Sequence, residues 1–266
     1  KRELISRAKN LITLKKAVAE QNRYQSFQNE LNVARKLQSS ILPEAAPEMK
    51  GIRSEFYYEP MDSVGGDFFD FHEISPTELG VIIADVSGHG IPAALVSAML
   101  KIAFSTQFRF SRDPVNLLSQ INSTLLGKTK GAFLTASYIY INLEKMELTH
   151  ARCGHLPLLI LGKYGLKPKL SLPSGKLIGW IPELDMKSEM IKLNVGDRLV
   201  LYTDGITEAM SVSKQMLGEE KWQEMLQSSM KYDLKTSKSN LLSEIKTFTG
   251  GRSPDDDVTL EMLEID

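Results

Sequence analysis

The chain has 266 residues, of which 42% are hydrophobic and 24% charged, so it can bury the core of one large or two small domains. A formal net charge of −1 argues against a general nucleic-acid binder. The single cysteine, Cys153, excludes an intramolecular disulfide framework, and we expect it to be a small buried apolar side chain.

The first 42 residues form a segment of distinct composition. They carry nine Lys or Arg and three Asp or Glu, a net charge of +6 that leaves −7 for the rest of the chain. They contain no Gly or Pro, and apolar residues follow heptad spacing at Leu11, Leu14 and Val18, then again from Tyr24 after a slip of one residue. This pattern predicts a helical linker over residues 1–42, with a narrow apolar seam typical of a coiled coil, that ends before Pro43.

From residue 52 the hydrophobic period changes to that of strands and shorter helices. We predict strands at 52–59, 68–74 and 79–84, helices at 91–108 and 113–126, strands at 132–143, 146–151, 156–162, 190–193 and 198–203, helices at 219–230 and 238–248, and a strand at 258–263. This order lacks the strict alternation of a parallel βαβ sheet, and the short connections favour antiparallel pairing. Two layers of sheet with helix pairs outside would use all these elements, which is an α+β fold.

Aspartates beside glycine or further aspartate stand at the ends of four apolar runs. The four segments are Val64-Gly65-Gly66-Asp67, Ala84-Asp85-Val86-Ser87-Gly88-His89-Gly90, Tyr202-Thr203-Asp204-Gly205 and Asp255-Asp256-Asp257-Val258-Thr259. Carboxylates without a Cys or His ligand pattern are what hard cations such as Mg²⁺ and Mn²⁺ prefer, and a backbone carbonyl such as that of Val86 can also be a ligand. Taken singly, Gly-Gly-Asp is a weak signal, Asp204-Gly205 is usually a turn and the Asp255–Asp257 run is better explained as a solvated loop. The rarer run from Asp85 to Gly90 could by itself be a strained loop or a phosphate nest. The occurrence of the four segments together indicates a metal site.

Clustered carboxylates repel one another and stay ionised only if a cation compensates them. Two cations about 3.5–4 Å apart can share a carboxylate, acidify a bridging water and deliver hydroxide in line to phosphorus. This chemistry needs no nucleophilic Ser or Cys. For the histidines the simpler interpretation is preferred: we expect His89 and His155 to be local hydrogen-bond partners rather than ligands.

The same segments carry a resemblance to a known family. Gly65-Gly66-Asp67-Phe68-Phe69-Asp70, the run from Ala84 to Ala94, Cys153-Gly154-His155-Leu156-Pro157, the run from Leu201 to Ala209, and Asp256-Asp257-Val258-Thr259 stand in the order seen in the SpoIIE/RsbU branch of the metal-dependent type 2C (PPM) serine/threonine phosphatases. The resemblance covers roughly residues 40–266. It implies that residues 43–266 are a phosphatase domain with an α-β-β-α sandwich and two Mn²⁺ or Mg²⁺ ions between the sheets.

The resemblance also implies roles for individual residues. Asp85 would bridge both metals, Val86 would offer its carbonyl, and Asp204 would ligate one metal. Asp67 would hold metal-bound water or ligate directly. In the last motif the acid two residues before the valine, Asp256, is the family ligand, and Asp257 is the alternative because an acidic triplet leaves the register open. Arg53 lies where a phosphate-holding arginine stands in eukaryotic relatives, but no motif fixes it there, so the substrate-binding residue stays unassigned.

The resemblance further implies hydrolysis of phosphoserine or phosphothreonine on a protein, with a phosphorylated anti-sigma-factor antagonist of the STAS type as the usual substrate. Such phosphatases often follow a sensor or receiver domain, and the helix would join the two, dimerise, and act as either a switch or a passive spacer. Two alternatives stay open: a non-catalytic phosphatase-like scaffold, and a metal-dependent phosphodiesterase or nucleotide hydrolase.

The chain begins at Lys1 without a methionine, and we expect it to be a fragment of a longer protein. No apolar run is long enough to span a membrane and no signal peptide is visible, so we expect a cytoplasmic location. A missing N-terminal region could still tether the full protein to a membrane.

Overall fold

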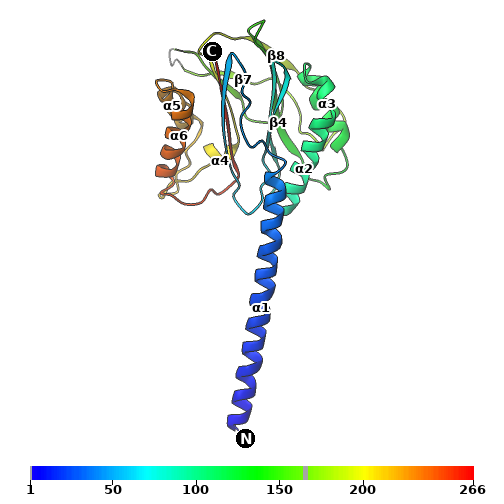
Figure 1. Ribbon diagram of the computed structural model, residues 1–266, viewed down its shortest axis with the longest axis vertical. Coiled ribbons are helices and arrows are strands. Elements are labelled where there is room, and N and C mark those ends of the chain that lie inside the picture. Colours follow the sequence, from blue (N-terminus) through cyan, green and yellow to red (C-terminus); the bar gives the residue numbers. More distant parts are fainter. Residues whose placement is uncertain (1, 164–166) are drawn as a thin grey trace.

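The computed structural model describes residues 2–163 and 167–266. Within these residues, two five-stranded antiparallel sheets face each other, each covered on its outer face by a pair of helices, and one long helix projects from the body (Figure 1). The predicted α-β-β-α sandwich of two antiparallel sheets, preceded by a long helix, is therefore confirmed.

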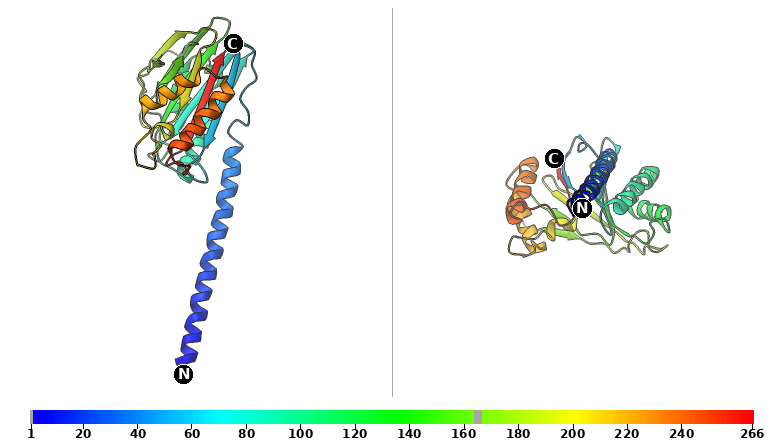
Figure 2. Two further views of the ribbon diagram at one scale, coloured as in Figure 1. Left: turned by 90° about the vertical axis from the view of Figure 1, so that its left-hand side faces the viewer. Right: turned by 90° about the horizontal axis from the view of Figure 1, so that it is seen from below.

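Helix α1 (Arg2–Ser39) extends far beyond the sandwich (Figure 2). It contains no helix breaker until Pro43, which cannot continue the backbone hydrogen-bond pattern. The apolar residues of the predicted seam face solvent: Leu11, Leu14 and Tyr24 are 62%, 61% and 64% exposed. The coiled coil stays a prediction. Among the side chains of the helix whose burial the structure describes, Gln38 in the last turn is the only buried one.

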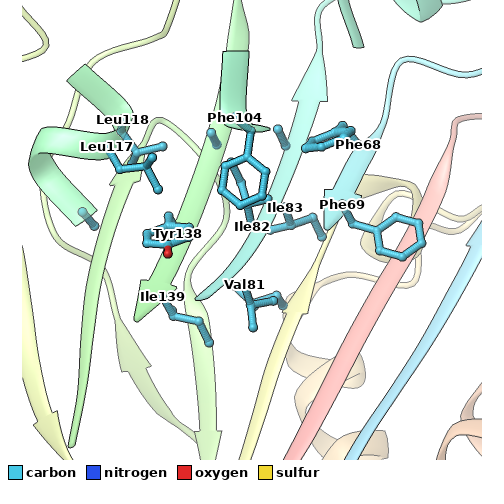
Figure 3. Packing of buried hydrophobic residues seen from close by; sticks show 14 of the residues in the cluster. Phe68, Phe69, Val81, Ile82, Ile83, Phe104, Leu117, Leu118, Tyr138 and Ile139 are labelled. Carbon is cyan, nitrogen blue, oxygen red and sulfur yellow. The ribbon is translucent and has the colours of Figure 1, made fainter. Parts of the chain in front are cut away.

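One sheet runs in the order β2 (Phe68–Ser75), β3 (Glu78–Val86), β4 (Leu134–Asn142), β5 (Glu147–Cys153) and β8 (Ser188–Lys192). Helices α2 (Ile91–Thr106) and α3 (Pro114–Leu125) cover its outer face. Strand alternation sends Ile82 and Tyr138 toward these helices, where Phe104 packs, and sends Val81 and Ile83 toward the other sheet (Figure 3). The central strand β3 is buried on both faces, as its continuous apolar run predicts.

The second sheet runs in the order β1 (Ile52–Glu59), β10 (Val258–Ile265), β9 (Arg198–Tyr202), β6 (Leu158–Leu161) and β7 (Lys169–Ser171). Helices α5 (Glu219–Ser229) and α6 (Leu234–Phe248) cover it and bury Trp222 completely. A four-residue helix, α4 (Asp204–Thr207), follows β9 directly, and a 3₁₀ turn, η1 (Phe108–Phe110), ends the α2 segment.

Most element boundaries differ from the sequence prediction by one to three residues. Helix α6 begins at Leu234 rather than at 238, because the Asp233 carboxylate caps it by accepting the backbone N–H of Thr236. Strand β3 extends to Val86, so Asp85 lies inside the strand rather than after it. Strand β7 and helix α4 were not predicted, since runs of three or four residues carry no clear periodicity.

In the part of the chain that the structure describes, no helix combines the length and the apolar character needed to cross a membrane.

Candidate metal centre

The four aspartate segments lie at one end of the sandwich. Asp67 precedes the first residue of β2, and antiparallel pairing of Phe68 with Ala84 brings the last residues of β3 beside it. On the other sheet, β10 begins at Val258 where β9 ends, so Asp204 and the Asp255–Asp257 run are neighbours. Each sheet therefore contributes two segments to the same end, and the facing sheets bring all four together.

Asp67 is the link between the two sheets. Its side chain is 1% exposed, and its Oδ2 accepts hydrogen bonds from the hydroxyls of Thr203 (2.8 Å) and Thr259 (2.6 Å), which belong to the other sheet. Burial is the main reason that the pKa of Asp67 lies well above its ordinary value, and the charge of Asp85 raises it further, whereas the threonine hydrogen bonds lower it.

Asp256 and Asp257 differ sharply in their surroundings. Asp257 is 5% exposed, and its carboxylate accepts backbone N–H groups from Met61 at 2.7 Å, Gly66 at 2.5 Å and, more weakly, Asp67 at 3.4 Å. Asp256 is exposed, and its Oδ1 accepts only the neighbouring N–H of Asp257. Asp257 therefore fixes the loop before β2, while Asp256 keeps an oxygen free for another partner.

Two glycines allow this close approach. A Cβ atom at Gly65 would lie 2.6 Å from both Asp257 Oδ2 and the Tyr58 hydroxyl. A Cβ atom at Gly205 would lie only 2.1 Å from the backbone oxygen of Asp257, closer than any real side chain permits. The glycines beside the aspartates are required because backbones from different motifs meet there.

The acids of the site lie close enough to disturb one another's ionisation. Burial raises the pKa of Asp85 from 3.8 to about 7, and the charges of Asp204, Asp256, Asp257 and Glu208 add to the effect in that order. The pKa of Asp204 is also raised, first by burial and then by Asp256 and Glu208. None of the main influences on the pKa of Asp85 is a cation. Among the residues that the structure describes, no Lys or Arg side chain forms an ion pair with these acids, so the cluster is a strongly negative region.

Three residues of this region were not among those predicted from the sequence. Glu208 lies one helical turn after Asp204, whose carbonyl accepts its backbone N–H at 2.7 Å, so the i, i+4 spacing could have indicated it. Thr203 and Thr259, which hold Asp67, stand next to predicted acids but belong to a different sheet from Asp67. Nothing in the sequence shows that contact.

His155 and the cysteine agree with their simpler interpretation, whereas the contact of His89 is longer than a hydrogen bond. His155 is buried, with Nδ1 bonded to the Thr135 hydroxyl at 2.7 Å and Nε2 near the Tyr202 carbonyl at 3.2 Å, and burial lowers its pKa to about 4. His89 is exposed, with Nδ1 3.7 Å from an Asp62 carboxylate oxygen. Cys153 is completely buried, and burial raises the pKa of its thiol to about 12. These residues do not contribute to the acid cluster.

Arg53 lies away from the acids. It pairs across the sheet with Glu264, near the end of β1 opposite to the one where Glu59 meets Val258. Its guanidinium binds the carboxylates of Glu264 and Asp266. Arg53 is therefore engaged in a surface ion-pair network at the far end of the strand, and the structure gives it no contact with the acid cluster.

The donor set fits a hard divalent cation. Every side chain of the cluster offers carboxylate oxygen, and the Val86 carbonyl lies 3.0 Å from the position a Cβ would take at Gly66, beside Asp67. Over residues 2–163 and 167–266, however, no three His, Cys, Asp or Glu side chains stand in an arrangement that could hold a metal ion as they are. The fit therefore rests on ligand chemistry and electrostatics.

Comparison with known proteins is consistent with this geometry. Residues 75–266 match the model of the family described as Stage II sporulation protein E (SpoIIE). The chain is 29% identical over 184 residues to phosphoserine phosphatase RsbP of Bacillus subtilis, covering 67% of this chain and 45% of RsbP. It is 28% identical over 190 residues to phosphoserine phosphatase RsbU of the same organism, covering 69% of this chain and 55% of RsbU. The chain thus spans about half the length of these curated relatives.

Solved structures show the same fold. The SiaA-PP2C domain of Pseudomonas aeruginosa superposes with a TM-score of 0.82 at 20% identity, covering 91% of this chain and 97% of that domain. The PP2C phosphatase domain of SpoIIE from Bacillus subtilis gives a TM-score of 0.66 at 21% identity, covering 81% of this chain and 63% of that one. On the family match and this shared fold, the chain belongs to the SpoIIE family, the SpoIIE/RsbU branch of the PP2C-type (PPM) phosphatases.

Proposed function

We propose that this chain is a metal-dependent protein serine/threonine phosphatase. The observation that carries the proposal is the convergence of Asp67, Asp85, Asp204 and Asp256 at one end of the sandwich, where burial and neighbouring charges raise the pKa values of Asp67, Asp85 and Asp204. Such a cluster needs a bound cation to be fully ionised at neutral pH. Two relatives that match the chain are named phosphoserine phosphatases, which gives the reaction class.

The burial of each acid and its hydrogen bonds distinguish the roles that we propose for them. Half-buried Asp85, whose pKa is raised by acids of the facing sheet, would hold both Mn²⁺ or Mg²⁺ ions, with the Val86 carbonyl beside it. Asp204 and Asp256 complete the ligand set from the other sheet. Asp67 accepts two hydroxyl hydrogen bonds on one oxygen, which suits a group that orients water rather than one that surrounds a metal. We assign Asp257 to positioning, since backbone N–H groups occupy its carboxylate.

The cations, when bound, would neutralise charge on the substrate phosphate and lower the pKa of water. Magnesium accompanies RsbX in its crystal structure, whose fold this chain shares with a TM-score of 0.63. The chain's own acids would hold the cations, orient water and receive its proton. No covalent intermediate on the enzyme is required, in keeping with the inert buried thiol of Cys153.

We extend the proposal to the biological setting of this family branch. The substrate would be a phosphorylated STAS-type anti-sigma-factor antagonist in the cytoplasm. Helix α1 would join the phosphatase domain, residues 43–266, to an upstream sensor or receiver domain. Its exposed apolar seam, including Leu11, Leu14 and Tyr24, supports a homodimer through paired helices, because burying such a seam removes apolar surface from water.

The test is phosphate release from an aryl phosphate and from phosphoserine peptides, with and without Mn²⁺. We expect Mn²⁺-dependent activity that Asp85→Asn and Asp204→Asn reduce by at least about a hundredfold, since each removes charge stabilisation at the reacting centre. Asp256→Asn should behave like them. Asp255→Asn, in the same acidic run but outside the proposed ligand set, is the matched control and should keep wild-type activity.

Two outcomes would contradict the proposal. Full activity of Asp85→Asn would exclude the two-metal mechanism. Failure of the wild type to bind Mn²⁺ at millimolar concentration, measured by calorimetry, would instead favour a non-catalytic scaffold. Faster hydrolysis of a phosphodiester or nucleotide than of any phosphoserine peptide would point to the other hydrolase class.

A further inference from the structure

Trp180, an exposed side chain, and Phe133, a half-buried one, form a stacked pair of aromatic rings. Trp180 is 64% exposed and stacks on Phe133, with ring centroids 5.2 Å apart and an interplanar angle of 21°. We call these two residues the aromatic platform. Large apolar side chains in this position gain little for folding, whereas tryptophan is the residue most enriched at the energetic centre of binding surfaces.

The platform is held rigidly by buried hydrogen bonds. On one side of Trp180, the backbone groups of Ile178 and Leu134 exchange two hydrogen bonds of 3.0 Å. The Asn122 side chain, 1% exposed on α3, accepts the N–H of Gly179 at 2.8 Å and donates to the Ile181 carbonyl at 2.8 Å. Both residues flanking Trp180 are thus fixed by one buried amide. A surface ring that is already ordered loses little entropy when a ligand packs on it.

Strand alternation assigns Phe133 of the platform to the face of the sheet that carries Asp85. Strand pairing sets Asp85 opposite Thr135, whose side chain points between the sheets to His155, and Phe133 is two residues along from Thr135. Ser87 fixes Phe133 by donating its N–H to the Phe133 carbonyl at 2.9 Å and accepting the Phe133 N–H on its hydroxyl at 3.0 Å. Strand geometry then puts the Cα atoms of Asp85 and Phe133 roughly 8 Å apart.

Positive charge borders the platform. Lys128 and Lys130 are exposed on the loop before Phe133, and Thr129 between them is 3.4 Å from the position of a Cβ at Gly179. Neither lysine forms an ion pair with a carboxylate in the described residues. The Lys128 ammonium donates to the Thr124 carbonyl at 2.5 Å, so Lys130 supplies the charge that is available to a ligand. An aromatic surface with an ammonium group, next to a negative acid cluster, is complementary to a polypeptide that carries a phosphate group.

We propose that the aromatic platform, together with Lys130, binds the polypeptide segment that flanks the phosphoserine of the protein substrate. The inference rests on the proposed phosphatase activity and names the surface that selects protein over small phosphate esters. At about 3.4 Å per extended residue, the platform would meet side chains about two to four positions from the phosphoserine.

The test compares two substrates in the full chain with Mn²⁺. For a pool of phosphoserine nonapeptides with mixed flanking residues, we expect Trp180→Ala to lower kcat/KM about tenfold, mainly through KM, as loss of an aromatic anchor does. For an aryl phosphate, which cannot reach the platform, kcat/KM should stay within twofold of wild type. Trp180→Phe should keep most of the wild-type activity on peptides. Lys130→Glu should lower kcat/KM for the peptides but not for the aryl phosphate.

Tyr232→Ala is the matched control, because Tyr232 is an exposed aromatic (41%) on the connection between α5 and α6, outside the other sheet. It should leave both substrates unchanged. Equal losses of peptide and aryl phosphate hydrolysis in Trp180→Ala, or no loss in either, would refute the proposed role of the platform. Neither result would contradict the proposed phosphatase activity. A wild type that hydrolyses the aryl phosphate without preferring the peptides would also refute the proposed role of the platform. No metal-dependent release from any substrate would instead refute the proposed function.

Binding gives a readout that does not depend on turnover. The chain has two tryptophans, and the other, Trp222, is completely buried. Addition of the phosphoserine peptide pool without Mn²⁺ should therefore shift the emission of Trp180, and the shift should vanish in Trp180→Phe but persist in Tyr232→Ala. Absence of a shift in the wild type at millimolar peptide would count against the platform.

Discussion

The acid cluster makes a quantitative prediction about stability in the absence of metal. In the folded chain the pKa of Asp85 is raised from 3.8 to about 7, chiefly by burial and then by the charges of neighbouring acids. Between these two values the folded state keeps a proton that the unfolded chain has released, so the free energy of unfolding falls as pH rises. At pH 8 the full cost is about 4 kcal/mol, and at pH 5 it is about 1.7 kcal/mol.

Replacing Asp85 by Asn removes this titration and keeps the shape of the side chain. The pH-independent cost of burying an amide is the same at both pH values, so it cancels when the two are compared. We therefore expect the free energy of unfolding of Asp85→Asn, measured relative to wild type at the same pH, to be about 2.5 kcal/mol higher at pH 8 than at pH 5. Because water still reaches part of the half-buried carboxylate, this figure is an upper value.

The assay is urea unfolding of both proteins, followed by Trp222 fluorescence after treatment with a chelator. Adding Mn²⁺ at pH 8 should then raise the unfolding midpoint of the wild type but not of Asp85→Asn, because a ligand stabilises only the state that binds it. A difference between variant and wild type that does not change with pH would refute the reasoning, since it would mean that Asp85 is ionised in the folded chain without a cation.

Three further substitutions test individual buried polar side chains. Gln38→Leu removes two buried hydrogen bonds between the end of α1 and the backbone of Gly65, at 2.5 and 3.0 Å. We expect it to lower the free energy of unfolding in urea by about 1–2 kcal/mol and to slow phosphate release. An unchanged midpoint and rate would show that α1 does not support the loop that contains Gly65. Glu261 is completely buried, and neither of its carboxylate oxygens has a hydrogen-bond partner in the described residues; burial holds its pKa well above the ordinary value. Glu261→Leu should therefore raise the free energy of unfolding by about 1–3 kcal/mol at pH 8 and by less at pH 5. Destabilisation at pH 8 would reveal a partner. Thr259→Val keeps the side-chain shape but removes the 2.6 Å hydrogen bond to Asp67. It should lower the free energy of unfolding by about 1–2 kcal/mol, seen as a lower thermal midpoint. No change would mean that the Thr203 hydroxyl alone is enough to hold Asp67.

Much of the fold could be predicted because its causes are local. Alternating and continuous apolar runs identified nine of the ten strands described, and the caps and first-turn prolines at Asp113-Pro114 and Pro92 marked helix starts. The short segments β7 and α4 were not found, because three or four residues have too little periodicity to stand out from a loop.

The sequence by itself determined the chemistry of this protein: four aspartate segments at strand ends, the glycines beside them, and no competing thiol or imidazole ligand set. Only the tertiary structure decided which atoms meet. Strands pair antiparallel within each sheet, and the two sheets face each other. This arrangement brings Asp67 into contact with Thr203 and Thr259. It also directs backbone N–H groups to the carboxylate of Asp257, while the carboxylate of Asp256 stays exposed. The physical reason is that hydrogen bonding and burial depend on distances between residues more than a hundred positions apart, which no local pattern encodes.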